Sequence, residues 1–140
     1  MVTRASQIGT DTAPPSHYLH PGDVACVGQG DRLETLLGSC IAIILTDPRR
    51  TVGAMCHIVH SSPAAQHDER PTSHGDAALA ALCGLLRQQG IQPQLCEAWV
   101  FGGGNMFPGL FRHQHVGEAN ARWVMEALAG MGVRVLGEGD

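Results

Sequence analysis

The sequence predicts a layered domain of the α+β or α/β class, in which helices pack on a β-sheet. Three observations lead to this prediction. Residues 40–47 and 51–60 are apolar runs around an Asp-Pro turn signal, which predicts a hairpin. Segments 75–90 and 116–132 carry apolar residues at helical spacing. Between these two helices, 96–104 is predicted as a strand that runs into a glycine loop.

The remaining segments complete one domain. Residues 1–16 are polar with paired prolines and are expected to form a flexible N-terminal tail, which leaves 17–140 as the single domain. A Pro-Gly turn opens a short strand within 20–28, 61–73 is polar and loop-like, and 133–140 is predicted as a last short strand. A chain of 140 residues, 44% of them hydrophobic, is long enough to bury a core.

Composition excludes several classes of function. A formal charge of -4 and the lack of a basic run argue against nucleic-acid binding. No apolar run approaches the roughly 20 residues of a membrane-spanning helix, and the N-terminus lacks the apolar core of a signal peptide. A cytoplasmic protein with reduced thiols is therefore expected. The five cysteines include no CxxC pair, which argues against a disulfide framework.

The predicted hairpin brings a cysteine and a histidine together. If Asp47 to Arg50 form a four-residue loop, Cys40 lies directly opposite His57 on one face of the hairpin. An imidazole at that distance can lower the pKa of a thiol and hold the thiolate ready for attack. Gly38 and Ser39 precede the cysteine and allow a tight turn whose backbone amides could form an oxyanion hole.

Structural and metal-binding alternatives remain open for the same residues. Cys40 could be a small core residue, and His57 could be a core or edge histidine. A zinc site would combine these two residues with Cys56 and His60. Because Cys56 and His57 are adjacent in a strand and point to opposite faces, one metal site cannot easily use both, and no metal is expected.

The glycine loop from Gly102 also has two interpretations. A phosphate-binding loop is disfavoured because the segment lacks both dinucleotide spacing and the Lys-Ser/Thr of a P-loop, so no cofactor is expected. A tight turn beside the cysteine is favoured, with Gly102, Gly103 and Asn105 as a possible substrate loop.

Several segments of the sequence resemble segments of one known protein family. "TLLGSCIAI" followed by "VGAMCHIVH" resembles the CheD family of chemoreceptor glutamine deamidases. "HPGDVACVG", "GDAALAALCGLLRQQG", "VFGGGNMF" and "VGEANARWVMEAL" resemble, in this order, the opening strand, a helix, a loop and a second helix of that family. The resemblance runs from about residue 18 to residue 135, and motifs in a shared order are far more specific than Leu-Gly-Ser-Cys alone.

The resemblance implies an α/β/α layered sandwich with a mixed sheet and a cysteine–histidine site. It also implies a protein-glutamine glutaminase that converts glutamines of methyl-accepting chemoreceptor helices to glutamate, with hydrolysis of glutamyl methyl esters as a second activity. Carried over to this chain, Cys40 is the nucleophile, His57 the general base and acid, and Thr35 the hydroxyl residue that orients the histidine.

The same resemblance implies an alternative and a departure. The family pairs with a CheC-type phosphatase of the response regulator, so a non-catalytic adaptor that stimulates this phosphatase is the rival function. The family usually continues beyond the position of Gly137 with a Gly-rich segment and a final strand, so the C-terminal end of this chain is expected to be shorter than in the family.

Overall fold

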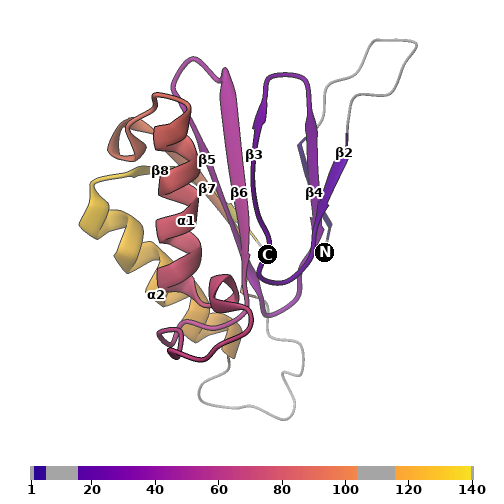
Figure 1. Ribbon diagram of the computed structural model, residues 1–140, viewed down its shortest axis with the longest axis vertical. Coiled ribbons are helices and arrows are strands. Elements are labelled where there is room, and N and C mark those ends of the chain that lie inside the picture. The colour runs from indigo at the N-terminus through magenta and orange to yellow at the C-terminus, as the bar shows by residue number, and fades with distance from the viewer. Residues whose placement is uncertain (1, 6–15, 104–115, 140) are drawn as a thin grey trace.

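The computed structural model describes residues 2–5, 16–103 and 116–139, which form eight strands and two α-helices (Figure 1). In chain order these are β1 (Val2–Ala5), β2 (Ser16–Leu19), β3 (Val24–Gly28), β4 (Arg32–Leu36), β5 (Ile41–Thr46), β6 (Val52–Ile58), α1 (Gly75–Gln88), β7 (Glu97–Gly102), α2 (Val116–Met131) and β8 (Arg134–Gly139). Two short 3-10 helices, η1 (Pro71–Ser73) and η2 (Pro93–Leu95), precede α1 and β7. The predicted fold class, α+β with a mixed sheet, is confirmed. No helix in these ranges is long and apolar enough to cross a membrane.

The molecule has three layers. A five-stranded sheet in the order β3-β6-β5-β7-β8 is antiparallel except for the parallel pair β7 and β8, which α2 connects. Helices α1 and α2 lie on one side of this sheet (Figure 1). On the other side, where the α/β/α expectation places helices, the described residues form a three-stranded sheet in the order β1-β4-β2.

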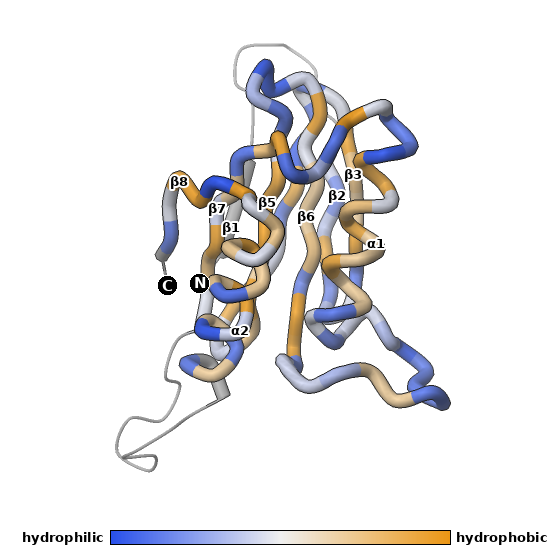
Figure 2. Tube along the Cα trace, turned by 90° about the vertical axis from the view of Figure 1, so that its left-hand side faces the viewer, coloured by the Kyte–Doolittle hydropathy of each residue, from blue (hydrophilic) through white to orange (hydrophobic). Residues whose placement is uncertain are grey.

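Two apolar clusters fill the spaces between the layers. The larger cluster lies between the helices and the five-stranded sheet and includes Ile41, Ile43 and Cys56. The smaller cluster lies between the two sheets and includes Ala42 and Met55. Neighbouring residues of β5 and β6 thus serve different clusters, because successive side chains of a strand point to opposite faces. Figure 2 shows hydrophobic residues along these central strands and mainly hydrophilic residues in the connecting loops.

Part of the expected N-terminal tail is a strand. β1 (Val2–Ala5) pairs antiparallel with β4, from Val2 opposite Leu36 to Ala5 opposite Leu33. The polar composition of 1–16 concealed this strand, because an edge strand can be stabilised by backbone hydrogen bonds to its one neighbour. The paired prolines of the predicted tail lie outside the described residues.

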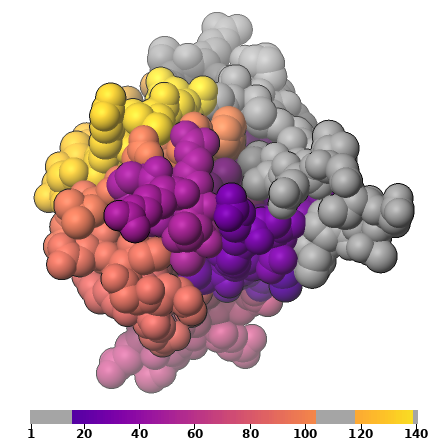
Figure 3. Space-filling view, turned by 90° about the horizontal axis from the view of Figure 1, so that it is seen from above, coloured from indigo at the N-terminus to yellow at the C-terminus, as the bar shows by residue number. Residues whose placement is uncertain are grey.

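The hairpin is present, but its register differs from the predicted one by two residues. Thr46 lies opposite Gly53, not Thr51. The Asp47 carboxylate accepts hydrogen bonds from the Thr51 N–H (2.7 Å), the Thr51 hydroxyl (2.7 Å) and the Val52 N–H (3.0 Å), so these groups are used within the turn. Figure 3 views the molecule from the end where this turn lies. Since the shift is an even number of residues, every side chain keeps its predicted face.

Candidate active site between the two sheets

The centre of the site is His57, near the end of β6. Its side chain is 2% exposed and lies on the β6 face that points to the smaller sheet, two residues from Met55 of the inter-sheet cluster. Its backbone is fixed on both sides by the turn before β3: the His57 N–H donates to the Asp23 carbonyl (3.2 Å), and the Gly22 N–H donates to the His57 carbonyl (2.9 Å). This position is therefore rigidly held between the layers.

Thr35 reaches His57 from the other sheet. It lies on β4, is fully buried, and has its Oγ1 atom 2.8 Å from Nδ1 of His57 and 2.8 Å from the carbonyl oxygen of Leu19. A hydroxyl has one proton, and a carbonyl can only accept. The Thr35 hydroxyl therefore donates to Leu19, and the Nδ1–H of His57 donates to Thr35. This chain of two hydrogen bonds assigns the imidazole tautomer.

The other nitrogen of His57 is left as an acceptor. Nε2 is buried and has no hydrogen-bond partner among the described residues. Burial lowers the pKa of His57, an effect that the Leu19 carbonyl and the Asp23 carboxylate oppose. A neutral imidazole with a free Nε2 lone pair is the form that can take a proton from a neighbouring acid.

Cys40 lies just before β5 on the same face, but not directly opposite His57 as predicted. The residue opposite His57 is Ala42, two positions further along, because the hairpin turn uses two more residues than expected. Cys40 is half-buried and packs against the inter-sheet cluster, and its thiol makes no hydrogen bond to a described residue. The ladder begins at Ile41, so Cys40 stands one residue before the paired strands, on the face that His57 shares. Burial raises the pKa of the Cys40 thiol, so the resting pair is a neutral thiol and a neutral imidazole.

The backbone around Cys40 is fixed by the glycine turn that follows β7. The Cys40 carbonyl accepts a hydrogen bond from the Gly103 N–H (3.0 Å). Gly102 has a φ of +104°, and a Cβ atom there would overlap the Cys40 carbonyl oxygen. A side chain at Gly102 would therefore collide with the cysteine backbone. Gly38 and Ser39 form the bend before Cys40, and outside the ladders the N–H groups of Ser39 and Cys40 donate to no described carbonyl.

One further buried polar residue of the site, Asn120, was not predicted from the sequence. Asn120 of α2 is 1% exposed and directs its Nδ2 atom at the carbonyl oxygens of Val59 (2.9 Å) and Ser39 (3.4 Å). The sequence holds a usable signal, because Asn120 stands four residues before Val124 and eight before Leu128, both fully buried. An amide at a position where helical spacing requires an apolar residue indicates a buried hydrogen-bonding role.

The structure separates the residues of the zinc alternative. Cys56 is fully buried in the helix-side cluster, facing away from Cys40, and burial raises the pKa of its thiol to about 12. His60 lies beyond β6 with its ring 4.7 Å from that of His74. Within residues 2–5, 16–103 and 116–139, no group of three or more His, Cys, Asp or Glu side chains could hold a metal ion. Asn105 lies outside the described residues.

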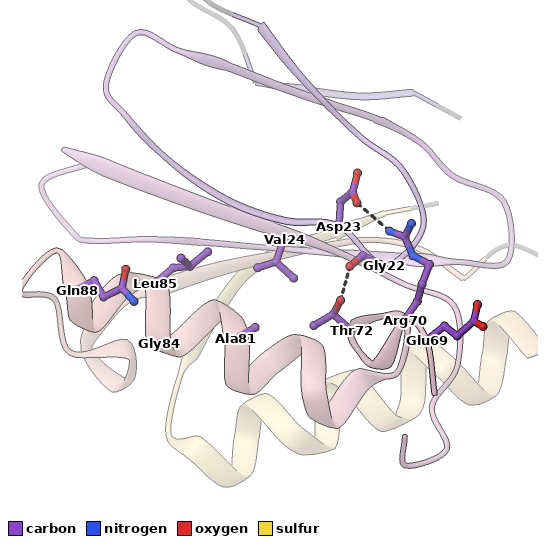
Figure 4. Close-up of a pocket in the computed structure, with 10 residues that line it drawn as sticks. All are labelled: Gly22, Asp23, Val24, Glu69, Arg70, Thr72, Ala81, Gly84, Leu85 and Gln88. Atoms are coloured by element: carbon purple, nitrogen blue, oxygen red, sulfur yellow. Dashed lines mark hydrogen bonds and ion pairs between the residues drawn. The ribbon is translucent and has the colours of Figure 1, made fainter. Parts of the chain in front are cut away.

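A cavity of about 680 Å³ lies elsewhere, between β3, the segment around η1 and α1 (Figure 4). Arg70 pairs with Asp23 across it at 2.9 Å, and the Thr72 hydroxyl donates to the Gly22 carbonyl at 2.6 Å. None of the predicted site residues lines it. The cavity is connected to the site only through the turn at Gly22 and Asp23. Arg70 and Thr72 bind this turn, and the turn itself bonds to the backbone of His57.

A half-buried thiol on the same sheet face as a buried imidazole, whose Nδ1 atom is bonded to a hydroxyl, is a side-chain set found in enzymes that use a cysteine nucleophile. Comparison with known proteins then gives the family. The sequence profile described as "CheD chemotactic sensory transduction" matches residues 59–139, and the chain belongs to the CheD family.

The curated relatives agree with this assignment. The chain is 33% identical over 129 residues to "Probable chemoreceptor glutamine deamidase CheD 2" of Albidiferax ferrireducens, a match that covers 89% of this chain and 75% of the relative. It is 36% identical over 107 residues to "Probable chemoreceptor glutamine deamidase CheD" of Pseudomonas fluorescens, covering 74% of this chain and 60% of the relative. The protein of the same name from Desulforamulus reducens is 32% identical over 120 residues, covering 83% and 72%. The part of the chain outside the match to the Albidiferax ferrireducens protein is shorter than the segment before Cys40 and shorter than the segment after His57. That match therefore includes both positions.

Proposed function

We propose that this protein is a chemoreceptor glutamine deamidase, with Cys40 as nucleophile, His57 as general base and acid, and Thr35 as the residue that orients His57. One observation carries the proposal. The hydrogen bonds from His57 to Thr35 and from Thr35 to Leu19 leave Nε2 of His57 as an unprotonated acceptor on the face that Cys40 shares. The family membership and the names of the relatives support the choice of amide and substrate.

The first half of the reaction forms a thioester. Nε2 of His57 takes the thiol proton as Sγ of Cys40 attacks the carboxamide carbon of a receptor glutamine. Protonated His57, still bonded to Thr35 through Nδ1, then gives this proton to the amide nitrogen, and the C–N bond breaks to release ammonia. A neutral thiol and a neutral imidazole are a suitable resting pair, because the nucleophile forms only when a substrate is in place.

The second half regenerates the enzyme. His57 takes a proton from water, the hydroxide attacks the thioester carbon, and the C–S bond breaks to release glutamate while the proton returns to Cys40. A glutamyl methyl ester would enter the same acyl-enzyme with methanol as the leaving group. Hydrolysis of such esters is therefore part of the proposal as a second activity of one site.

The backbone supplies the remaining group. The N–H groups of Ser39 and Cys40, which donate to no described carbonyl, are suited to stabilise the oxyanion of the tetrahedral intermediate, and Gly38 lies in the bend before them. Gly102 and Gly103 hold the Cys40 carbonyl on the opposite side and, with Asn105, are proposed to border the bound glutamine.

The proposal includes partners and a compartment. The substrate glutamines are those of chemoreceptor helices in the cytoplasm, where a catalytic thiol stays reduced. Binding to a CheC-type phosphatase remains a prediction from the family resemblance. The adaptor alternative is less favoured, because a protein that only binds a partner has no need for a tautomer-fixed imidazole on the same sheet face as a half-buried thiol.

The test is intact-mass spectrometry of a chemoreceptor signalling fragment after incubation with wild-type protein and with Cys40→Ala. Each glutamine converted to glutamate adds about one mass unit, because an NH₂ group is replaced by OH. We expect the gain with wild type and none with Cys40→Ala. Cys56→Ala is the matched control: it removes a thiol that faces the other side of the sheet, so conversion should persist.

Two results would count against the proposal. Conversion by Cys40→Ala at the wild-type rate would exclude Cys40 as nucleophile. A fragment left unchanged by folded wild-type protein would favour the adaptor function, which binding to a CheC-type phosphatase would then test directly.

A further inference from the structure

The two strands that carry the site separate just where the cysteine lies. The ladder between β5 and β6 ends with Ile41 opposite Ile58, so the next pair in the same register would be Cys40 and Val59. That pair does not form. The Val59 N–H donates to the Ser73 carbonyl (2.8 Å) on the side of β6 away from β5, and the Cys40 carbonyl accepts from Gly103 of the neighbouring turn.

Asn120 bridges this opening from the helix side of the sheet. Its Nδ2 atom donates to the Val59 carbonyl at 2.9 Å and lies 3.4 Å from the Ser39 carbonyl. One side chain therefore connects the segment after His57 to the residue before Cys40. Val124, one helical turn further along α2, occupies the same face but belongs to the apolar cluster.

The bond to Ser39 has a consequence for the cysteine amide. In a trans peptide the C=O and the following N–H point in opposite directions. A Ser39 carbonyl held toward α2 therefore turns the Cys40 N–H away from the helices, toward the face where the Cys40 thiol and His57 lie. With Gly103 fixing the next carbonyl, both peptide planes around Cys40 are set from outside the loop.

We propose that Asn120 is a positioning residue: it ties the Ser39–Cys40 peptide to the end of β6 and so aims the Cys40 N–H at the reacting carbonyl oxygen. The catalytic role of the Cys40 N–H rests on the deamidase function proposed above. The link that Asn120 forms between the Ser39 carbonyl and the end of β6 does not depend on that function. The position of the Ser39 carbonyl explains why an amide is buried at a helical position that otherwise requires an apolar residue.

The experiment compares wild type with Asn120→Leu, which removes both donated hydrogen bonds while keeping the number and branching of the side-chain heavy atoms, and with Val124→Ala. The Val124→Ala variant weakens the packing of α2 without touching the loop. NMR relaxation reports the backbone order of Ser39 and Cys40, and deamidation of the receptor fragment reports kcat and KM. We expect order parameters for these two residues to fall from roughly 0.85 to below about 0.6 in Asn120→Leu only. We expect kcat to fall by about tenfold or more with KM within about threefold, because the donor is misaligned and not the substrate.

Each other outcome has a defined meaning. Unchanged order at Ser39 and Cys40 in folded Asn120→Leu would overturn the proposal, and so would an equal loss of kcat in Val124→Ala. If Asn120→Leu does not fold, Asn120→Asp keeps the volume and replaces the donating amide by a carboxylate, and the same measurements apply. If wild type itself converts no glutamine, the deamidase function fails, while the relaxation data still decide whether Asn120 holds the loop.

Discussion

Two histidines of this protein have opposite hydrogen-bonding environments. His57 lies between the two sheets, donates from Nδ1 to Thr35, and keeps Nε2 without a partner among the described residues. His74 precedes α1 and uses both nitrogens: Nδ1 is 2.8 Å from the Ser62 carbonyl and Nε2 is 2.7 Å from a carboxylate oxygen of Asp68. Both partners of His74 are acceptors, so both hydrogen bonds form together only when both nitrogens carry a proton, as in the imidazolium.

These environments determine which of the two histidines can accept a proton from another group. Burial lowers the pKa of His57, whereas the Ser62 carbonyl, the largest cause, and the Asp68 carboxylate raise the pKa of His74 against the opposing effect of burial. A general base needs a lone pair at the pH where it works. His57 has one, while His74 has used both nitrogens to close the loop between β6 and α1. Its ring lies 4.7 Å from that of His60 within this loop.

The largest expected effect separates the two residues by activity. His57→Gln should lower kcat for deamidation by about 10²–10⁴-fold, the usual contribution of a general acid–base. His74→Gln should leave kcat within about threefold, since its ring bonds only to the loop. The measurement is the initial rate of ammonia release from a receptor fragment, with circular dichroism to establish that both variants are folded. Equal losses of rate in the two variants would contradict the assigned roles.

The sequence alone predicted the face of the sheet on which these residues lie, but it did not predict their contacts. The faces of Cys40, Cys56 and His57 follow from the two-residue period of a strand, and they survive a register shift of two because that shift is even. The shift itself depends on how Asp47 closes the turn, and a side chain that satisfies backbone amides leaves only a weak signal in composition.

Local sequence patterns could not predict the contacts between the layers. Thr35 could be assigned only through the family resemblance, because its bond to His57 joins two different sheets across 22 positions of the chain. The Leu19 carbonyl, which fixes the direction of that bond, belongs to a backbone and is invisible in any motif. Asn120 had a signal in its helical spacing, but its targets Ser39 and Val59 depend on tertiary packing.

A smaller effect is expected from the residue that orients His57. Thr35→Val keeps the shape of the side chain but removes the hydroxyl, so the Leu19 carbonyl and the Nδ1–H of His57 both lose a partner. Leaving buried groups unpaired costs about 1–3 kcal/mol of unfolding free energy. We also expect kcat to fall by about tenfold, because the proton of His57 is no longer confined to Nδ1. Urea denaturation and deamidation rates measure the two effects.

Thr35→Ser is the matched control. It restores the hydroxyl and should recover most of the rate, although the lost methyl group leaves a small cavity in the inter-sheet cluster. If Thr35→Val were as active as wild type, the hydrogen bond at 2.8 Å would be structural, and His57 would select its tautomer by other means.

The smallest expected effect compares the two histidines by the pH dependence of stability. For His57 the folded-state pKa lies below the ordinary value of 6.5, so the unfolded chain binds more protons in the window just below pH 6.5, and stability is lost as the pH falls through it. For His74 the folded-state pKa lies above 6.5, so its contribution is complete below pH 6.5 and is lost as the pH rises through the window above.

Urea midpoints for wild type, His57→Gln and His74→Gln at about pH 5.5, 6.5 and 8 separate the contributions of the two histidines to stability. His57→Gln should flatten only the acid side of the profile, and His74→Gln only the alkaline side. If His74→Gln flattened the acid side instead, the ring of His74 in the wild type would be neutral in the folded state. His74 would then not differ from His57 in protonation, although the proposed contrast requires this difference.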